Sequence, residues 1–172
     1  MAQNPTTSTN NCVQEFKRVS KVAVLAASVF NCGDLAKWQS SSLTPVAVDP
    51  GGTDAAVSAS AALILGVFND TQPVASLGGV LPKNICNIIV SGIFQFFVDD
   101  AATYYQGDTV TIGQNAQTVR KTGASAGNSI GIAAPENFFQ INASSCAGIT
   151  PGVGGTLLVA LKAQDINQIA GG

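Results

Sequence analysis

The chain has 172 residues, of which 46% are hydrophobic, 10% are charged and none is histidine. Disordered segments have the opposite composition, and a net charge of −2 with a pI near 4.8 argues against nucleic-acid binding, which needs a concentrated basic face. We expect one domain, or two small barrels that share an interface. Because soluble domains usually carry about 25% charged residues, we expect other chains to cover much of this surface.

The two ends of the chain lack an apolar period. We predict an extended N-terminal arm over residues 1–20, a β-rich domain over residues 21–163 and a C-terminal tail over residues 164–172. Terminal sequences of this kind are ordered when neighbouring chains hold them. Both arms are therefore candidate interfaces.

The N-terminal region contains a pattern that imitates a signal peptide. Lys17, Arg18 and Lys21 precede the apolar run 22–30. A polar Asn/Thr stretch comes before them, so we predict no cleaved leader. The uncharged stretches 55–69 and 84–98 are too short and too polar to cross a bilayer, and we predict no membrane partner.

Short apolar and β-branched runs, separated by Gly, Asn and Pro, fill the rest of the chain. This pattern is typical of a small barrel or sandwich. The alanines of 55–68 would allow a helix, but residues 57–60 alternate, and we predict no amphipathic helix. The predicted fold class is mainly β: a small β-barrel or β-sandwich with extended N- and C-terminal arms. The predicted strands lie at 22–26, 63–68, 85–90, 93–98, 109–112, 117–120, 129–133 and 156–161.

A weak internal echo divides the domain. Gly33-Asp34 is followed by Ile64-Leu-Gly66-Val, and Gly107-Asp108 by Ile130-Gly131-Ile-Ala. The intervals differ, so this is either a true duplication or a coincidence. In the second case, Gly-Asp suits the turn before a strand, and a strand glycine allows close backbone approach.

The echo suggests two halves, 21–73 and 91–163. A long insert, Val74 to Val90, would separate them. Ser91-Gly92 lies between two of the predicted strands and indicates a bend or bulge there.

The sequence contains only partial matches to the motifs of serine nucleophiles and of phosphate-binding loops. Gly127-Asn-Ser129-Ile-Gly131 and the overlapping Gly123-Ala-Ser125-Ala-Gly127 match the G-x-S-x-G nucleophile elbow. The chain has no histidine to take the serine proton. Lys121-Thr122 precedes these glycines, whereas a phosphate-binding loop needs its Lys-Ser/Thr after them. We predict no catalytic residue and no enzyme activity.

Metal chemistry is equally poorly supported. Asp99-Asp100 would point to opposite faces of a strand. A calcium site that adds Asp34 and Asp108 lacks the usual spacing. The four cysteines also lack metal-ligand spacing, and we predict buried free thiols rather than ligands. We therefore predict no metal, no cofactor and no small-molecule substrate. The cysteines are Cys12, Cys32, Cys86 and Cys146.

An aromatic cluster near the centre of the chain has three interpretations. It could be core, an interface for another subunit, or a ligand face. Its members are Phe94, Phe96, Phe97, Tyr104 and Tyr105.

The echo motifs carry a family resemblance. With the closing strand 155–161, the two Gly-Asp turns and the Ile130-Gly-Ile-Ala strand resemble the capsid decoration (cement) proteins of tailed bacteriophages, over about residues 20–163. The long insert departs from the usual pattern. The resemblance implies a homotrimer on the outer surface of the phage head, made in the host cytoplasm. It would tie major capsid protein subunits together, and deleting residues 1–13 would weaken attachment.

Two alternatives remain open. One is an exported β-sandwich that binds carbohydrate or a cell surface, which would need a concave aromatic face made by Trp38, Tyr104 and Tyr105. The other is a structural component of the phage tail or baseplate. The composition fits that component as well as it fits a head protein.

Overall fold

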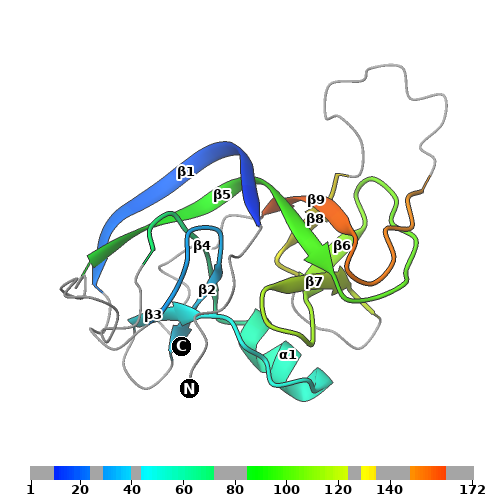
Figure 1. The fold of residues 1–172 in the computed structure, drawn as a ribbon, viewed down its shortest axis with the longest axis horizontal. Coiled ribbons are helices and arrows are strands. Elements are labelled where there is room, and N and C mark those ends of the chain that lie inside the picture. The colour runs from blue at the N-terminus through cyan, green and yellow to red at the C-terminus, as the bar shows by residue number, and fades with distance from the viewer. Residues whose placement is uncertain are drawn as a thin grey trace.

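The computed structural model describes residues 10–23, 29–39, 44–71, 85–123, 129–134 and 148–161 (Figure 1). They form a mainly β fold with a closed five-stranded β-barrel and extra strands, which confirms the predicted fold class. The elements in these residues are β1 (Asn11–Ala23), β2 (Leu35–Gln39), β3 (Thr44–Ala47), α1 (Asp54–Ala61), β4 (Ile64–Phe68), β5 (Ile85–Val98), β6 (Thr109–Ile112), β7 (Thr118–Lys121), β8 (Gly131–Ala133) and β9 (Thr156–Leu161).

The closed barrel is formed by the second half of β5 together with β6, β7, β8 and β9. β5 pairs in parallel with β7 and antiparallel with β9, and the ring is completed through β6 and β8. Side chains on alternate positions of β9, at Leu157, Val159 and Leu161, are buried. They join the larger of two apolar cores. We call these strands the C-terminal unit.

The N-terminal part of the chain repeats the same strand order. β1 pairs with residues 85–95 of β5, and β4 pairs with β5 at Ile88 and Ile89; β4 also pairs with β2, and β2 with β3. β3 also contacts β1, in the place where β7 pairs with β5. We call these strands the N-terminal unit. The long strand β5 is therefore the last strand of one unit and the first strand of the other (Figure 1).

The two Gly-Asp turns occupy equivalent places in the two units. Gly33 and Gly107 have φ angles of 95° and 88°, which glycine adopts readily. The carboxylates of Asp34 and Asp108 each accept a hydrogen bond from the backbone N–H three residues earlier, at 2.7 and 2.9 Å. Their carbonyl oxygens accept from β4 and β8 respectively, both at 2.8 Å. The sequence echo therefore corresponds to a repeated local structure.

The strand glycines of the echo also have the same role. A Cβ atom on Gly66 would collide with the carbonyl oxygen of Ile89, and one on Gly131 with that of Ala160. Close approach of neighbouring strands thus requires glycine at both positions. The interval between turn and strand is longer in the N-terminal unit, which holds α1 between β3 and β4.

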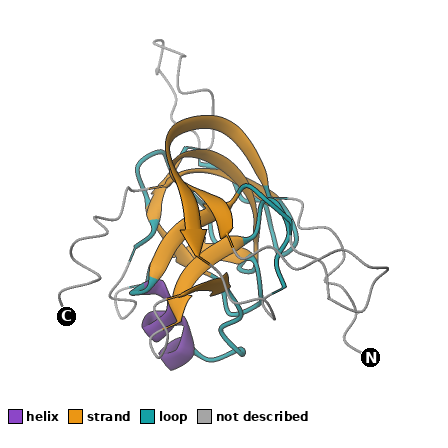
Figure 2. Ribbon diagram, turned by 90° about the vertical axis from the view of Figure 1, so that its left-hand side faces the viewer, coloured by secondary structure: helices purple, strands orange, loops and turns teal. Residues whose placement is uncertain are grey.

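Helix α1 decides the interpretation of the 55–68 segment, where the alanines allowed a helix and the alternation of residues 57–60 argued against one. The Thr53 side chain caps it by accepting from the N–H of Ala56 at 3.2 Å, and Asp54 lies in the first turn. Its side chains are small, so it shows little of the apolar periodicity by which a helix is recognised. Figure 2 shows α1 at the lower end of the molecule, below the strands.

The strand boundaries differ from those expected. β1 crosses the predicted boundary at residue 20, so residues 11–20 belong to the sheet rather than to an arm. The last six residues of the expected insert, 85–90, are the first part of β5. The remaining insert residues and both chain ends lie mostly outside the described residues.

Ser91-Gly92 does not interrupt β5. The strand is continuous over 14 residues, but its pairing with β1 is irregular at this dipeptide, as the sequence predicted: Val90 is an extra residue of β5 beside Ser91, and Phe16 is an extra residue of β1 opposite Ser91 and Gly92. A Cβ atom on Gly92 would collide with the carbonyl oxygen of Gln14. The glycine thus permits β1 to lie close to β5.

Gln117 joins the two units. It has a positive φ of 61° and lies just before β7. Its side-chain oxygen accepts from the N–H of Leu35, and its amide nitrogen donates to the carbonyl oxygen of Val48 at 3.0 Å. Both partners belong to the N-terminal unit and are buried. A second link runs from Arg120 to Asp54 at 2.9 Å.

Candidate interaction surface

The described serine and lysine of the partial catalytic motifs lie at or next to strands of the barrel. Ser129 precedes β8, and Ser125 lies outside the described residues. Lys121, in β7, pairs with the Asp108 carboxylate at 2.6 Å and donates to the carbonyl oxygen of Thr103 at 3.0 Å. The ammonium group is thus engaged within the fold rather than turned towards a phosphate.

The adjacent Asp99 and Asp100 act in separate turns. Asp99 accepts from the backbone N–H of Gln114 at 2.5 Å. Asp100 accepts from the hydroxyl of Tyr104 at 2.7 Å and from the N–H of Lys121 at 2.9 Å. Across the part of the chain that the structure describes, no group of three His, Cys, Asp or Glu residues could hold a metal ion. These carboxylates satisfy backbone donors near the barrel.

The aromatic cluster is mostly core. Phe94, Phe96 and Tyr104 are fully buried in the larger core, which confirms the core interpretation for them, whereas Tyr105 is exposed. Burial and the neighbouring Asp100 raise the pKa of the Tyr104 phenol well above its usual value. Trp38 packs against the smaller core of the N-terminal unit. These residues therefore do not form one aromatic face.

The described cysteines are not uniformly buried. Of the three cysteines within the described residues, Cys86 is buried, whereas Cys12 and Cys32 are exposed, which corrects the prediction of burial for these two. Partial desolvation raises the pKa of both exposed thiols, and the Glu15 carboxylate raises that of Cys12 further. Both thiols stay protonated at neutral pH, a state that is poorly nucleophilic.

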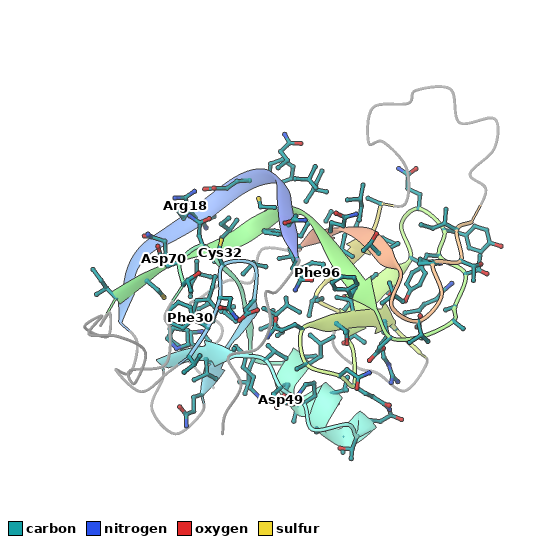
Figure 3. The ribbon with its side chains drawn as sticks, viewed as in Figure 1. Arg18, Phe30, Cys32, Asp49, Asp70 and Phe96 are labelled. Carbon is teal, nitrogen blue, oxygen red and sulfur yellow. The ribbon has the colours of Figure 1, made fainter. Side chains whose placement is uncertain are left out.

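The most unusual surface lies along β1. All eight side chains of residues 11–18 are exposed, including Val13 at 59% and Phe16 at 57%. Arg18, labelled in Figure 3, forms a bidentate ion pair with Glu15, with an Nε–Oε1 distance of 2.8 Å. Hydrogen bonding to Arg18 lowers the pKa of the Glu15 carboxyl. Neither apolar residue was singled out from the sequence, because their exposure depends on how β1 pairs with β5.

No protein-family profile matches the sequence, and comparison with curated proteins finds no match. None of the helices in the described residues is long and apolar enough to cross a membrane.

Proposed function

We propose that this chain is a structural virion protein, a capsid decoration protein that binds the outer surface of a tailed-phage head. The observation that carries the proposal is the pair of Gly-Asp turns, each hydrogen-bonded to a strand whose glycine tolerates no side chain. Those motifs are the ones on which the family resemblance rests. In this protein they position the neighbouring strands of the two units.

The composition supports a mechanical role. Only 10% of the residues are charged, and small apolar residues are abundant, which suits close contact with other subunits. On a closed lattice the same weak contact recurs many times, so each contact needs to contribute little binding energy. The described acidic and lysine side chains of the C-terminal unit bind their own backbone and one another. That arrangement favours a scaffold over a reaction centre.

The partner in this proposal is the major capsid protein, and the chain would act as a homotrimer. Attachment would involve the N-terminal residues and one end of the barrel. β-Strand addition or an extended segment lying across a neighbour are two ways in which such residues bind.

The test mixes the purified chain with empty expanded heads assembled from the major capsid protein of the same genome. Co-sedimentation should saturate at a fixed number of copies per head. A variant that lacks residues 2–9 leaves β1 whole, and we expect it to bind more weakly while its circular dichroism stays unchanged. Absence of binding by the full chain to heads would refute the proposal, and binding to isolated tails instead would favour a tail component.

A further inference from the structure

The exposure of β1 is unusual for a strand. Side chains of a strand point alternately to two faces, so one face is normally buried. In β1 the eight consecutive residues 11–18 are all exposed, while the paired segment of β5 is largely buried. Both faces of this part of β1 are therefore open.

The two exposed apolar side chains of this segment lie at the irregular points of the strand. Cys12 pairs with Phe94 and Gln14 with the adjacent Ile93, which leaves Val13 as an extra residue. In the same way, Phe16 is extra between two residues that pair with Gly92 and Ser91. Bulges re-aim side chains and bend the bulged strand. Here both bulges present large apolar groups to solvent.

The charge of β1 is opposite to that of the rest of the chain. β1 holds three basic residues and one acidic residue, a net charge of +2, so the remainder carries −4 of the total of −2. Among the described residues outside β1, the exposed carboxylates are Asp49, in the segment that leads to α1, and Asp54, the first residue of α1, which pairs with Arg120 of its own copy. A second copy of this chain therefore offers the complementary charge.

The two charged regions lie at opposite ends of the molecule. In Figure 1, β1 arches over the top and α1 lies at the bottom, and Figure 3 places Asp49 beside α1 and Arg18 on β1. A contact between them cannot be made within one copy. Between copies it would be head-to-tail, which generates a closed ring when the rotation closes.

We propose that β1 docks on a second copy of this chain, with Val13 and Phe16 as apolar anchors and Lys17 facing Asp49 of that copy. The docking does not depend on capsid binding. The proposal names the surface through which the self-association implied by the family resemblance would occur. Because the charges in this contact are exposed to solvent, we expect added salt to weaken the association.

The test measures the mass of the full chain by sedimentation velocity over a dilution series. We expect concentration-dependent self-association of the wild type. The double variant V13S/F16S should raise the dissociation constant at least about tenfold, since two apolar anchors are lost. V153S removes an apolar side chain that is 72% exposed and precedes Gly154, whose N–H binds Val98 beyond the β5 residues that pair with β1; this variant should associate like the wild type. A wild type that stays monomeric at every concentration, or equal association by V13S/F16S, would overturn the proposal.

A charge exchange locates the second surface. K17E alone and D49K alone should each weaken association, and the double variant K17E/D49K should recover it. If D49K has no effect, or the double variant is as weak as the sum of the single changes, Asp49 is not part of the docking site. Circular dichroism of each variant shows whether it is folded. Head binding is measured separately, so failure of the capsid proposal leaves this result unaffected.

Discussion

Replacing Gln117 by alanine should weaken the connection between the two units. The side chain bridges the N–H of Leu35 and the carbonyl oxygen of Val48, residues that are 0% and 2% exposed. The Leu35 carbonyl keeps its bond from the N–H of Val48 at 2.9 Å. The substitution therefore leaves one buried donor and one buried acceptor without partners. At about 1–3 kcal/mol for each such group, we expect a loss of about 2–6 kcal/mol in the free energy of unfolding.

The measurement is urea unfolding at neutral pH, in which a lower midpoint at an unchanged m-value reports the loss of stability. Q114A provides the matched control, because Gln114 lies in the same turn and its side chain binds Asp54, which is 75% exposed. We expect Q114A to cost no more than about 0.5 kcal/mol. A loss for Q117A no larger than that for Q114A would refute the bridging role.

The isosteric variant Q117E separates the two halves of the bridge. At neutral pH its carboxylate still accepts from Leu35 but cannot donate to the carbonyl oxygen of Val48, and a partly buried charge is added. Protonation at low pH restores a donor. The stability of Q117E relative to wild type should therefore improve as the pH falls, and a pH-independent difference would contradict this interpretation.

Three further predictions concern the local structure. G131A should destabilise the protein by about 2 kcal/mol or more through the clash with the neighbouring strand, whereas G123A, which meets no atom within 4 Å, should be nearly neutral in the same urea assay. Hydrogen bonding to Lys121 lowers the pKa of the Asp108 carboxyl in the folded protein. The ionised carboxylate therefore stabilises the fold fully above the ordinary Asp pKa of about 3.9, and this contribution is lost as the pH falls through the lowered pKa. D108N should flatten this part of the acid-unfolding curve, and an unchanged curve would contradict the assignment. T53A removes the side chain that caps α1 and should lower the free energy of unfolding by about 1 kcal/mol in a urea or thermal experiment. An unchanged free energy of unfolding would contradict a stabilising role for this cap.

The β class and the local motifs could be predicted from the sequence because they depend on neighbouring residues. The short apolar and β-branched runs at 109–112 and at 156–161 predicted β6 and β9 with the boundaries that the structure has. The Gly-Asp turns and the strand glycines were recognised for the same reason. The backbone conformation of a turn depends on the residues of the turn itself. A glycine within a strand indicates that another strand lies close to it, although the sequence does not show which strand.

The strand β1, the helix α1 and the Gln117 bridge depend on contacts far apart in the sequence. The first part of β1 is polar and lacks alternation, and its strand conformation comes from pairing with β5, some 75 residues later. α1 has small side chains on every face, so its position was set by its cap and by packing. Nothing local marks Gln117 as the partner of Leu35, 82 residues away. Sequence alone therefore determined the class of fold and its repeated motifs. Tertiary structure decided which strands pair with β5 and which apolar side chains stay exposed to solvent, because hydrogen bonds and burial between distant segments leave no local pattern in the sequence.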